Sequence, residues 1–160
     1  MPDRARGFSL VELLIVVAII LIIAAVGIPN FLRSKIAANQ ASAVGSLRLV
    51  STAEVSYSTT YNNGYSTTLA ALGPPANAGD QPTSTAAGLI DNILASGAKS
   101  GYTFTYSAGP PDSTGRVGAY NITGVPMNYL TGTFSYYTDQ SGVIRQNPSA
   151  TAGSSDSPIN

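Results

Sequence analysis

The chemistry open to this chain of 160 residues is limited to carboxylates, hydroxyls, amides, amines and phenols, because it contains neither cysteine nor histidine. This composition excludes thiol nucleophiles, thiolate metal sites and the commonest general base. Three aspartates, Asp112, Asp139 and Asp156, fall in Gly-, Ser- and Pro-rich segments, where aspartate favours turns through its own backbone hydrogen bonds. Since no dense acidic cluster or convergent acidic pair accompanies them, we expect no enzymatic activity, no metal site and no cofactor.

Glu12 is the acid with the most unusual surroundings, because it interrupts a long apolar run. Between residues 8 and 28 only Ser9 and Glu12 are polar, and the run spans about 21 residues, or about 31 Å as a helix. This length matches the hydrocarbon core of a bilayer. A carboxylate one turn inside such a helix costs about 3 kcal/mol to insert, so Glu12 predicts a functional site with a partner for its charge.

The short segment before the run is polar and basic. Arg4 and Arg6 outnumber Asp3, which favours a cytoplasmic location for this end. Three interpretations compete. A secretory signal has an apolar region of about 7 to 15 residues, shorter than this one, although residues 24–27 resemble a poor cleavage site. A plain membrane anchor leaves Glu12 unexplained, and the third interpretation is cleavage before the apolar run, after Gly7.

The sequence Arg-Gly-Phe-Ser-Leu-Val-Glu-Leu over residues 6–13 resembles the N-terminal cleavage and methylation motif of the type IV pilin superfamily. That superfamily includes type IV pilins and the pseudopilins of type II secretion systems. The resemblance implies that a prepilin peptidase cuts between Gly7 and Phe8 and methylates the new N-terminus of Phe8. It also implies an assembly role for Glu12, the fifth residue after the cut, which would neutralise the Phe8 amine of a neighbouring subunit and so fix the register.

The helical pattern continues beyond the apolar run. Pro29 has no backbone N–H and Gly27 weakens the same place, so we expect a kink or a loosened turn there. Apolar residues then recur at spacings near three, four or seven up to Tyr57, with Arg48 and Glu54 between them. We therefore predict one helix over residues 8–60, with residues 8–29 in the membrane or the filament core and an amphipathic second half.

The rest of the chain predicts a small antiparallel sheet and hence an α+β fold. A turn at residues 61–65 ends the helix, and residues 66–101 are irregular apart from a helical turn over 67–72 and a short helix over 86–96. Alternating patterns over 102–106, 116–123, 132–138 and 143–145 predict three or four strands that pack on the amphipathic half of the helix, as in the pilin fold. We expect residues 30–147 to form a globular head and residues 148–160 a mobile tail with almost no apolar anchor.

These features favour a structural subunit of a type IV pilus that serves adhesion, motility or DNA uptake. The alternative is a pseudopilin of a type II secretion system, and a more remote one is a simple membrane-anchored binding domain. The expected partners are further copies of the chain in a helical filament, a prepilin peptidase, the inner-membrane assembly machinery and, before assembly, the membrane itself. No basic patch indicates nucleic acid. The precursor is expected in the inner membrane with a periplasmic head, and the product in an extracellular pilus or a periplasmic pseudopilus.

Overall fold

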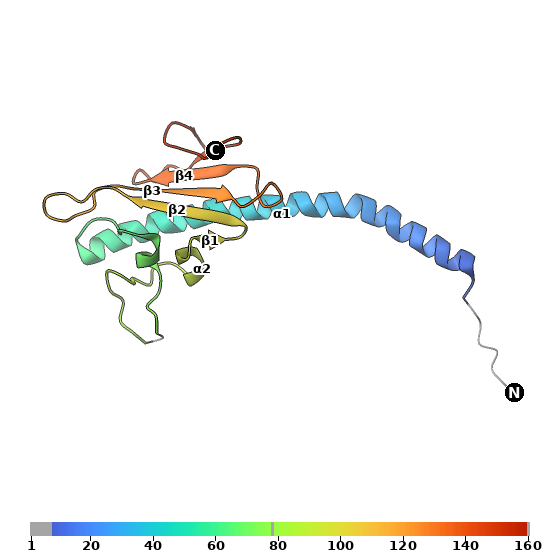
Figure 1. Cartoon of the computed structure of the whole chain (residues 1–160), viewed down its shortest axis with the longest axis horizontal. Helices are drawn as coiled ribbons and strands as arrows, with labels where there is room; N and C mark the ends of the chain where they lie inside the picture. The colour runs from blue at the N-terminus through green and yellow to red at the C-terminus, as the bar shows by residue number, and fades with distance from the viewer. Residues whose placement is uncertain (1–7, 78, 160) are drawn as a thin grey trace. The chain divides into compact units, whose positions relative to one another are not determined.

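The computed structural model describes residues 8–77 and 79–159, which form two compact units (Figure 1). The first unit ends at Lys35 and the second begins at Ile36, so helix α1, Leu10–Tyr61, contributes to both. The predicted bounds of this helix, residues 8–60, are close to those of the structure. Among the residues described, α1 is the helix that is long and apolar enough to cross a membrane, and no residue of its most apolar window is buried.

The second unit contains an antiparallel sheet in which each strand pairs with the next one in sequence. Its six strands, counted over the described residues, are β1 (Ala98–Lys99), β2 (Tyr102–Ala108), β3 (Tyr120–Pro126), β4 (Ser135–Asp139), β5 (Arg145–Asn147) and β6 (Ser157–Pro158). The α+β prediction is confirmed. The sheet exceeds the three or four strands expected because β1 and β6 have two residues each and are too short to show alternation.

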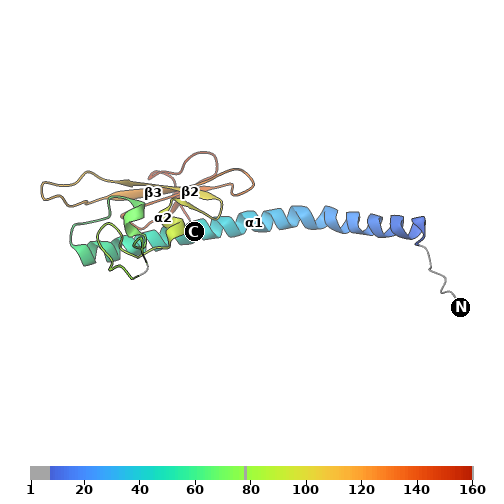
Figure 2. The ribbon, with the colours of Figure 1, turned by 60° about the horizontal axis from the view of Figure 1, so that its bottom comes forward.

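The core of the second unit lies between this sheet and residues 36–61 of α1, and Figure 2 shows the sheet as one layer over the helix. Leu47, Val50 and Tyr57 form part of the buried face of the helix, at the spacing expected of one helical stripe. Tyr102 and Phe104 are buried from the sheet, and the residues that alternate with them in β2 are exposed. The apolar face of the helix, which repeats about every 3.6 residues, and that of the sheet, which repeats every 2, therefore pack together in one core.

The chain reverses direction directly after α1. Asn62 and Gly64 have positive φ angles of 52° and 82°, and the Tyr65 N–H donates a 2.9 Å hydrogen bond to the Val117 carbonyl. A Cβ atom at Gly64 would lie 2.1 Å from that carbonyl oxygen, so the turn requires glycine. The connecting segment then holds the 3₁₀ helix η1, Leu69–Leu72, inside the predicted helical turn. The helix predicted over residues 86–96 is shortened to α2, Asn92–Ala95, because Asp91 caps its start.

The C-terminal segment differs from the prediction of a tail with almost no apolar anchor. Ala152 is only 3% exposed, Ile159 packs against the core, and β6 pairs with β5. The side-chain amide of Asn147 donates a 2.9 Å hydrogen bond to Oδ1 of Asp156. Hydrogen bonds and the apolar contacts of Ala152 and Ile159 thus hold the described part of this segment to the sheet, where a mobile tail was expected.

Candidate functional site

The start of α1 is fixed by two local hydrogen bonds to side chains. The Ser9 N–H donates to Oε2 of Glu12 at 2.9 Å, and the Val11 N–H donates to Oγ of Ser9 at 3.3 Å. The Leu13 N–H also bonds to the Ser9 carbonyl at 3.2 Å, as the first turn of a helix requires. Ser9 and Glu12 thus cap the helix as a capping box does, except that the Ser9 hydroxyl accepts the Val11 N–H in place of the Glu12 N–H. The signature Ser-x-x-Glu before an apolar run is the sequence signal for this cap.

The apolar side chains that follow are not buried by any of the residues that the structure describes. The large apolar side chains between Phe8 and Ile28 are 46–80% exposed. A continuous apolar surface of this size is characteristic of contact with lipid or with another protein. The segment therefore has the geometry of a membrane span or of an interface between helices.

Glu12 is the charged residue of this segment, and its carboxylate accepts a hydrogen bond from the Ser9 N–H at the start of the helix. Over residues 8–77 and 79–159 no cation lies within ion-pair distance of it. The Ser9 N–H offsets part of the cost of placing the carboxylate among apolar groups, because a hydrogen bond to an ionised acceptor is stronger than one between neutral groups. The hydrogen bond alone does not neutralise the charge of the carboxylate.

The structure describes only part of the predicted cleavage and kink residues. Phe8 precedes the helix and is 80% exposed, whereas Gly7 lies outside the described residues. Gly27 and Pro29 both lie inside α1, whose helical assignment is unbroken, and the Asn30 side-chain amide donates a 3.2 Å hydrogen bond to the Val26 carbonyl. The soft point at Gly27 and Pro29 stays a prediction.

A second polar cluster, which the sequence analysis missed, is buried in the head. Glu54 has no exposed surface, although its polarity suggested a solvent-facing position. It accepts hydrogen bonds from the Ser66 N–H at 2.9 Å, the Ser66 hydroxyl at 2.5 Å and the Tyr106 hydroxyl at 2.7 Å. Burial, followed by the adjacent Glu54 carboxylate, raises the pKa of Tyr106 above its ordinary value. The spacing could have indicated that Glu54 is buried, because it lies four residues after Val50 and three before Tyr57, on the buried face of the helix.

The three aspartates considered for metal binding are engaged in their own turns. Oδ1 of Asp112 accepts the Thr114 N–H at 2.8 Å, Oδ1 of Asp139 accepts the Ser141 N–H at 2.9 Å, and Oδ2 of Asp156 accepts the Gly153 N–H at 2.8 Å. The hydrogen bond from the Thr114 side chain, with those from nearby backbone amides, lowers the pKa of Asp112. Within the described part of the chain no group of three acidic side chains is placed to hold a metal ion.

Two comparisons with known proteins address the N-terminal segment. Residues 2–28 match the family model of the prokaryotic N-terminal methylation motif. A stretch of 54 residues is 48% identical to the type IV major pilin protein PilA of Myxococcus xanthus (strain DK1622), and it covers 34% of this chain and 24% of that protein. The resemblance to the type IV pilin family is confirmed. The match spans about a quarter of the relative's own length. No solved structure matches the chain.

Pilins and pseudopilins are structural subunits rather than enzymes. The family implies assembly into filaments and processing of a precursor in general. The exposed apolar helix and the similarity to a pilin also support a membrane-anchored precursor. Together with the long helix and antiparallel sheet, these findings support a subunit of pilin or pseudopilin type.

Proposed function

We propose that the chain is a structural subunit of a type IV pilus. The prepilin peptidase cuts between Gly7 and Phe8, removes residues 1–7 as a leader and methylates the amine of Phe8. Residues 8–29 hold the precursor in the inner membrane with the head, from residue 30 onward, in the periplasm. The inner-membrane assembly machinery then moves the subunit into an extracellular filament of further copies, which serves adhesion, motility or DNA uptake.

The observation that carries this proposal is the combination of an exposed apolar helix with one carboxylate near its start. The large side chains of this segment are at least 46% exposed, so the segment exchanges lipid for protein contacts when it leaves the bilayer. Such an exchange keeps the apolar area out of water in both states. A contact between two different surfaces of the same chain, repeated without closure, produces a filament.

Glu12 fixes the register between neighbouring subunits in this assembly. In the isolated subunit its carboxylate accepts the Ser9 N–H at 2.9 Å, and in the filament it additionally pairs with the Phe8 amine of a neighbour. The net stability gained from the pair is small, because both groups lose water. A subunit out of step leaves both charges buried and unpaired, so the pair selects the correct arrangement.

Mass spectrometry of the mature N-terminal peptide tests the processing step. We expect a peptide that begins with N-methylated Phe8. A peptide that retains Met1, or one that begins near Gly27, would contradict the proposal and favour a plain anchor or a secretory signal.

Electron microscopy of the producing cells then separates the two kinds of filament. Long surface fibres support the pilus, for which the similarity to a major pilin is the specific observation. Processed protein without surface fibres supports the alternative, a pseudopilin of a type II secretion system.

A further inference from the structure

Helix α1 carries two basic side chains shortly after its apolar run. Arg33 and Lys35 are exposed, and both belong to the first compact unit. They follow Ile28, the last residue of the run, by about 7.5 and 10.5 Å along the helix. The headgroup layer on each side of a bilayer is about 5 to 7.5 Å thick outside the hydrocarbon core. The backbone of this turn therefore lies near the outer boundary of that layer when the apolar run spans the core.

The direction of helical side chains brings the two charges back toward the bilayer. In an α-helix every Cα–Cβ bond is tilted toward the N-terminus, which here is the side of the apolar run. Long basic side chains keep their methylene groups on apolar surface and place the charge in the polar layer. Phe31 and Leu32, which are 68% and 38% exposed, supply apolar surface at this level. We therefore expect the guanidinium of Arg33 and the ammonium of Lys35 at the level of the lipid phosphates.

The described part of the chain offers neither cation a negative partner. Between residues 13 and 53 the sequence contains no aspartate and no glutamate. The positions three and four residues before and after each cation, where a partner on the same helix would lie, hold only neutral residues. Over residues 8–77 and 79–159 no carboxylate lies within ion-pair distance of Arg33 or Lys35.

The spacing of the two cations favours a partner that surrounds the helix. Two residues correspond to about 200° of rotation, so Arg33 and Lys35 lie on nearly opposite sides of α1. A single acidic segment of another protein reaches one of these sides, whereas the lipids around a membrane span reach both. Each basic residue near an anionic membrane surface gives about a five-fold preference for negatively charged lipid.

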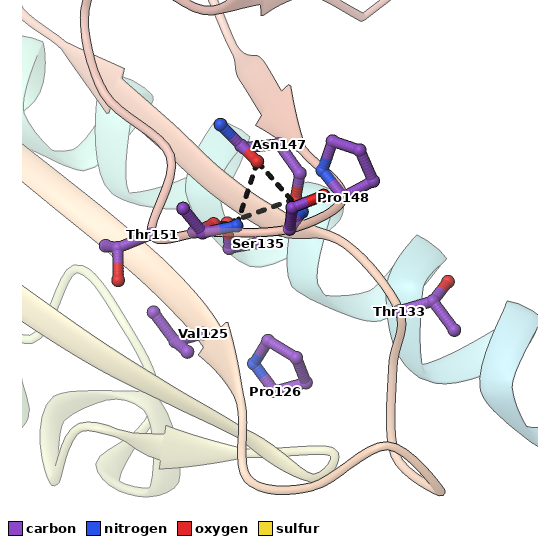
Figure 3. A pocket seen from close by; sticks show the side chains of 9 residues that line it. Val125, Pro126, Thr133, Ser135, Asn147, Pro148 and Thr151 are labelled. Carbon is purple, nitrogen blue, oxygen red and sulfur yellow. Dashed lines mark hydrogen bonds between the residues drawn. The ribbon is translucent and has the colours of Figure 1, made fainter.

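The hollow beside the sheet is not a rival site for a phosphate. Figure 3 shows Val125 and Pro126 on one side of this hollow of about 290 Å³ and Asn147 on the other. None of its lining residues is charged, and Oδ1 of Asn147 already accepts the N–H groups of Ser149 and Ala150, both at 2.9 Å. A phosphate in this hollow would lose water without gaining a cation.

We propose that Arg33 and Lys35 bind the phosphate groups of anionic phospholipids, one lipid on each side of α1, in the leaflet at the C-terminal end of the apolar run. This inference rests on the membrane span of the proposed function and not on the filament. It therefore applies to a pilin and to a pseudopilin alike. Both contacts are open to water, so added salt should weaken them.

Spin-labelled lipids test the proposal on the full-length chain in vesicles of phosphatidylcholine. Electron paramagnetic resonance measures how much of a spin-labelled phosphatidylglycerol, or of a spin-labelled phosphatidylcholine, is immobilised at the protein. We expect the wild type to prefer the phosphatidylglycerol. Arg33→Gln combined with Lys35→Gln should lower this preference at least about two-fold, because the five-fold effect of each cation is averaged over all lipids around the helix.

Two matched variants control for charge. Arg48→Gln removes the same charge from an exposed position of the second unit and should leave the preference unchanged. Arg33→Lys combined with Lys35→Arg keeps both charges and should preserve the preference. Arg4 and Arg6 are present in every variant, so the differences report on the substituted residues alone. An unchanged preference after the loss of both cations, or an equal loss in Arg48→Gln, would overturn the inference.

Carbonate extraction of the same vesicles separates this inference from the proposed function. Wild-type chain that stays in the vesicles but shows no preference for phosphatidylglycerol overturns the inference alone. Wild-type chain that carbonate removes has no membrane span, and both proposals then fail. If the loss of Arg33 and Lys35 leaves the lipid preference unchanged but lowers the yield of filaments, acidic groups of a neighbouring subunit are the partners, and the lipid assignment is wrong.

Discussion

The phenol of Tyr106 donates a 2.7 Å hydrogen bond to Oε1 of Glu54, a carboxylate with no exposed surface. The second oxygen of this carboxylate accepts the Ser66 N–H, so α1, the segment after it and strand β2 meet at one acid. Three hydrogen bonds, from the Ser66 N–H, the Ser66 hydroxyl and the Tyr106 hydroxyl, offset the cost of burying this carboxyl group. These hydrogen bonds give Glu54 a structural role in the head, a role distinct from that of Glu12.

Replacing Glu54 should destabilise the head strongly. Glu54→Ala leaves the Ser66 N–H without its acceptor and the Tyr106 hydroxyl with only the Ser66 carbonyl, 2.9 Å away, and we expect a loss of about 3 kcal/mol in the free energy of unfolding. Tyr106→Phe removes one donor and should cost only about 1 kcal/mol. Urea unfolding of the detergent-solubilised chain measures both losses, and equal effects of the two variants would contradict the central role of the carboxylate.

The buried tyrosines predict a loss of stability in alkali. Burial raises the pKa of Tyr102, Tyr106, Tyr120 and Tyr136 above the ordinary value of 10.0. Below about pH 10 these phenols are neutral in both states, and their contribution to stability is complete. Above that pH the unfolded chain ionises first, so each phenol removes about 1.4 kcal/mol of stability per pH unit until its folded pKa is reached.

Tyrosinate absorbance recorded together with circular dichroism checks this prediction. The buried phenols should ionise only as the fold is lost, and Tyr106→Phe should make the fall of stability with pH shallower by one proton. Ionisation of all nine tyrosines in a fold that stays intact would show the prediction to be wrong.

The regular elements could be predicted because their periodicities are long enough to read. The helix and the strands around Tyr102, Ile122 and Tyr136 follow from spacings near 3.6 and 2. The predicted bounds of the strands were less accurate. The strand predicted over residues 116–123 runs from Tyr120 to Pro126, and Val117 forms only an isolated bridge before it. A bridge made by distant chain segments leaves no local pattern.

The polar interior could not be predicted in the same way. Glu54 occupies an apolar stripe, and its burial depends on Ser66 and Tyr106, which lie 12 and 52 residues away. The anchors of the C-terminal segment likewise depend on tertiary hydrogen bonds to Ser135 and Asn147. In contrast, the Ser9–Glu12 box is local and was readable from its spacing alone.

The capping box predicts a measurable effect of Ser9 on the first helical turn. Ser9→Ala keeps the N–H that Glu12 accepts but removes the acceptor for the Val11 N–H, at a cost of about 1 kcal/mol to the helix end. Hydrogen exchange at the Val11 amide in detergent should become about five-fold faster. Ser9→Thr retains a hydroxyl cap and serves as the matched control, and unchanged exchange in Ser9→Ala would exclude the cap.

Pro29 predicts a local weakness that a single substitution should remove. Pro29→Ala restores the N–H that the Ala25 carbonyl lacks, so exchange of the amides around it should slow. Gly27→Ala, which has open space for a Cβ atom, should add about 1 kcal/mol to the same turn. If hydrogen exchange across residues 25–33 is the same in both variants as in the wild type, no soft point exists there.

Glu12 allows its two roles to be separated, because glutamine also closes a capping box but carries no charge. Glu12→Ala should abolish filaments while membrane insertion persists, since removing a carboxylate makes insertion easier by about 3 kcal/mol. Glu12→Gln keeps the bond from the Ser9 N–H and removes only the pairing with the neighbour's amine. We expect it to fail in assembly as Glu12→Ala does, as judged by electron microscopy and by the sedimentable fraction of the protein. Filaments of normal abundance in Glu12→Gln would mean that the cap, and not the charge, is what assembly requires.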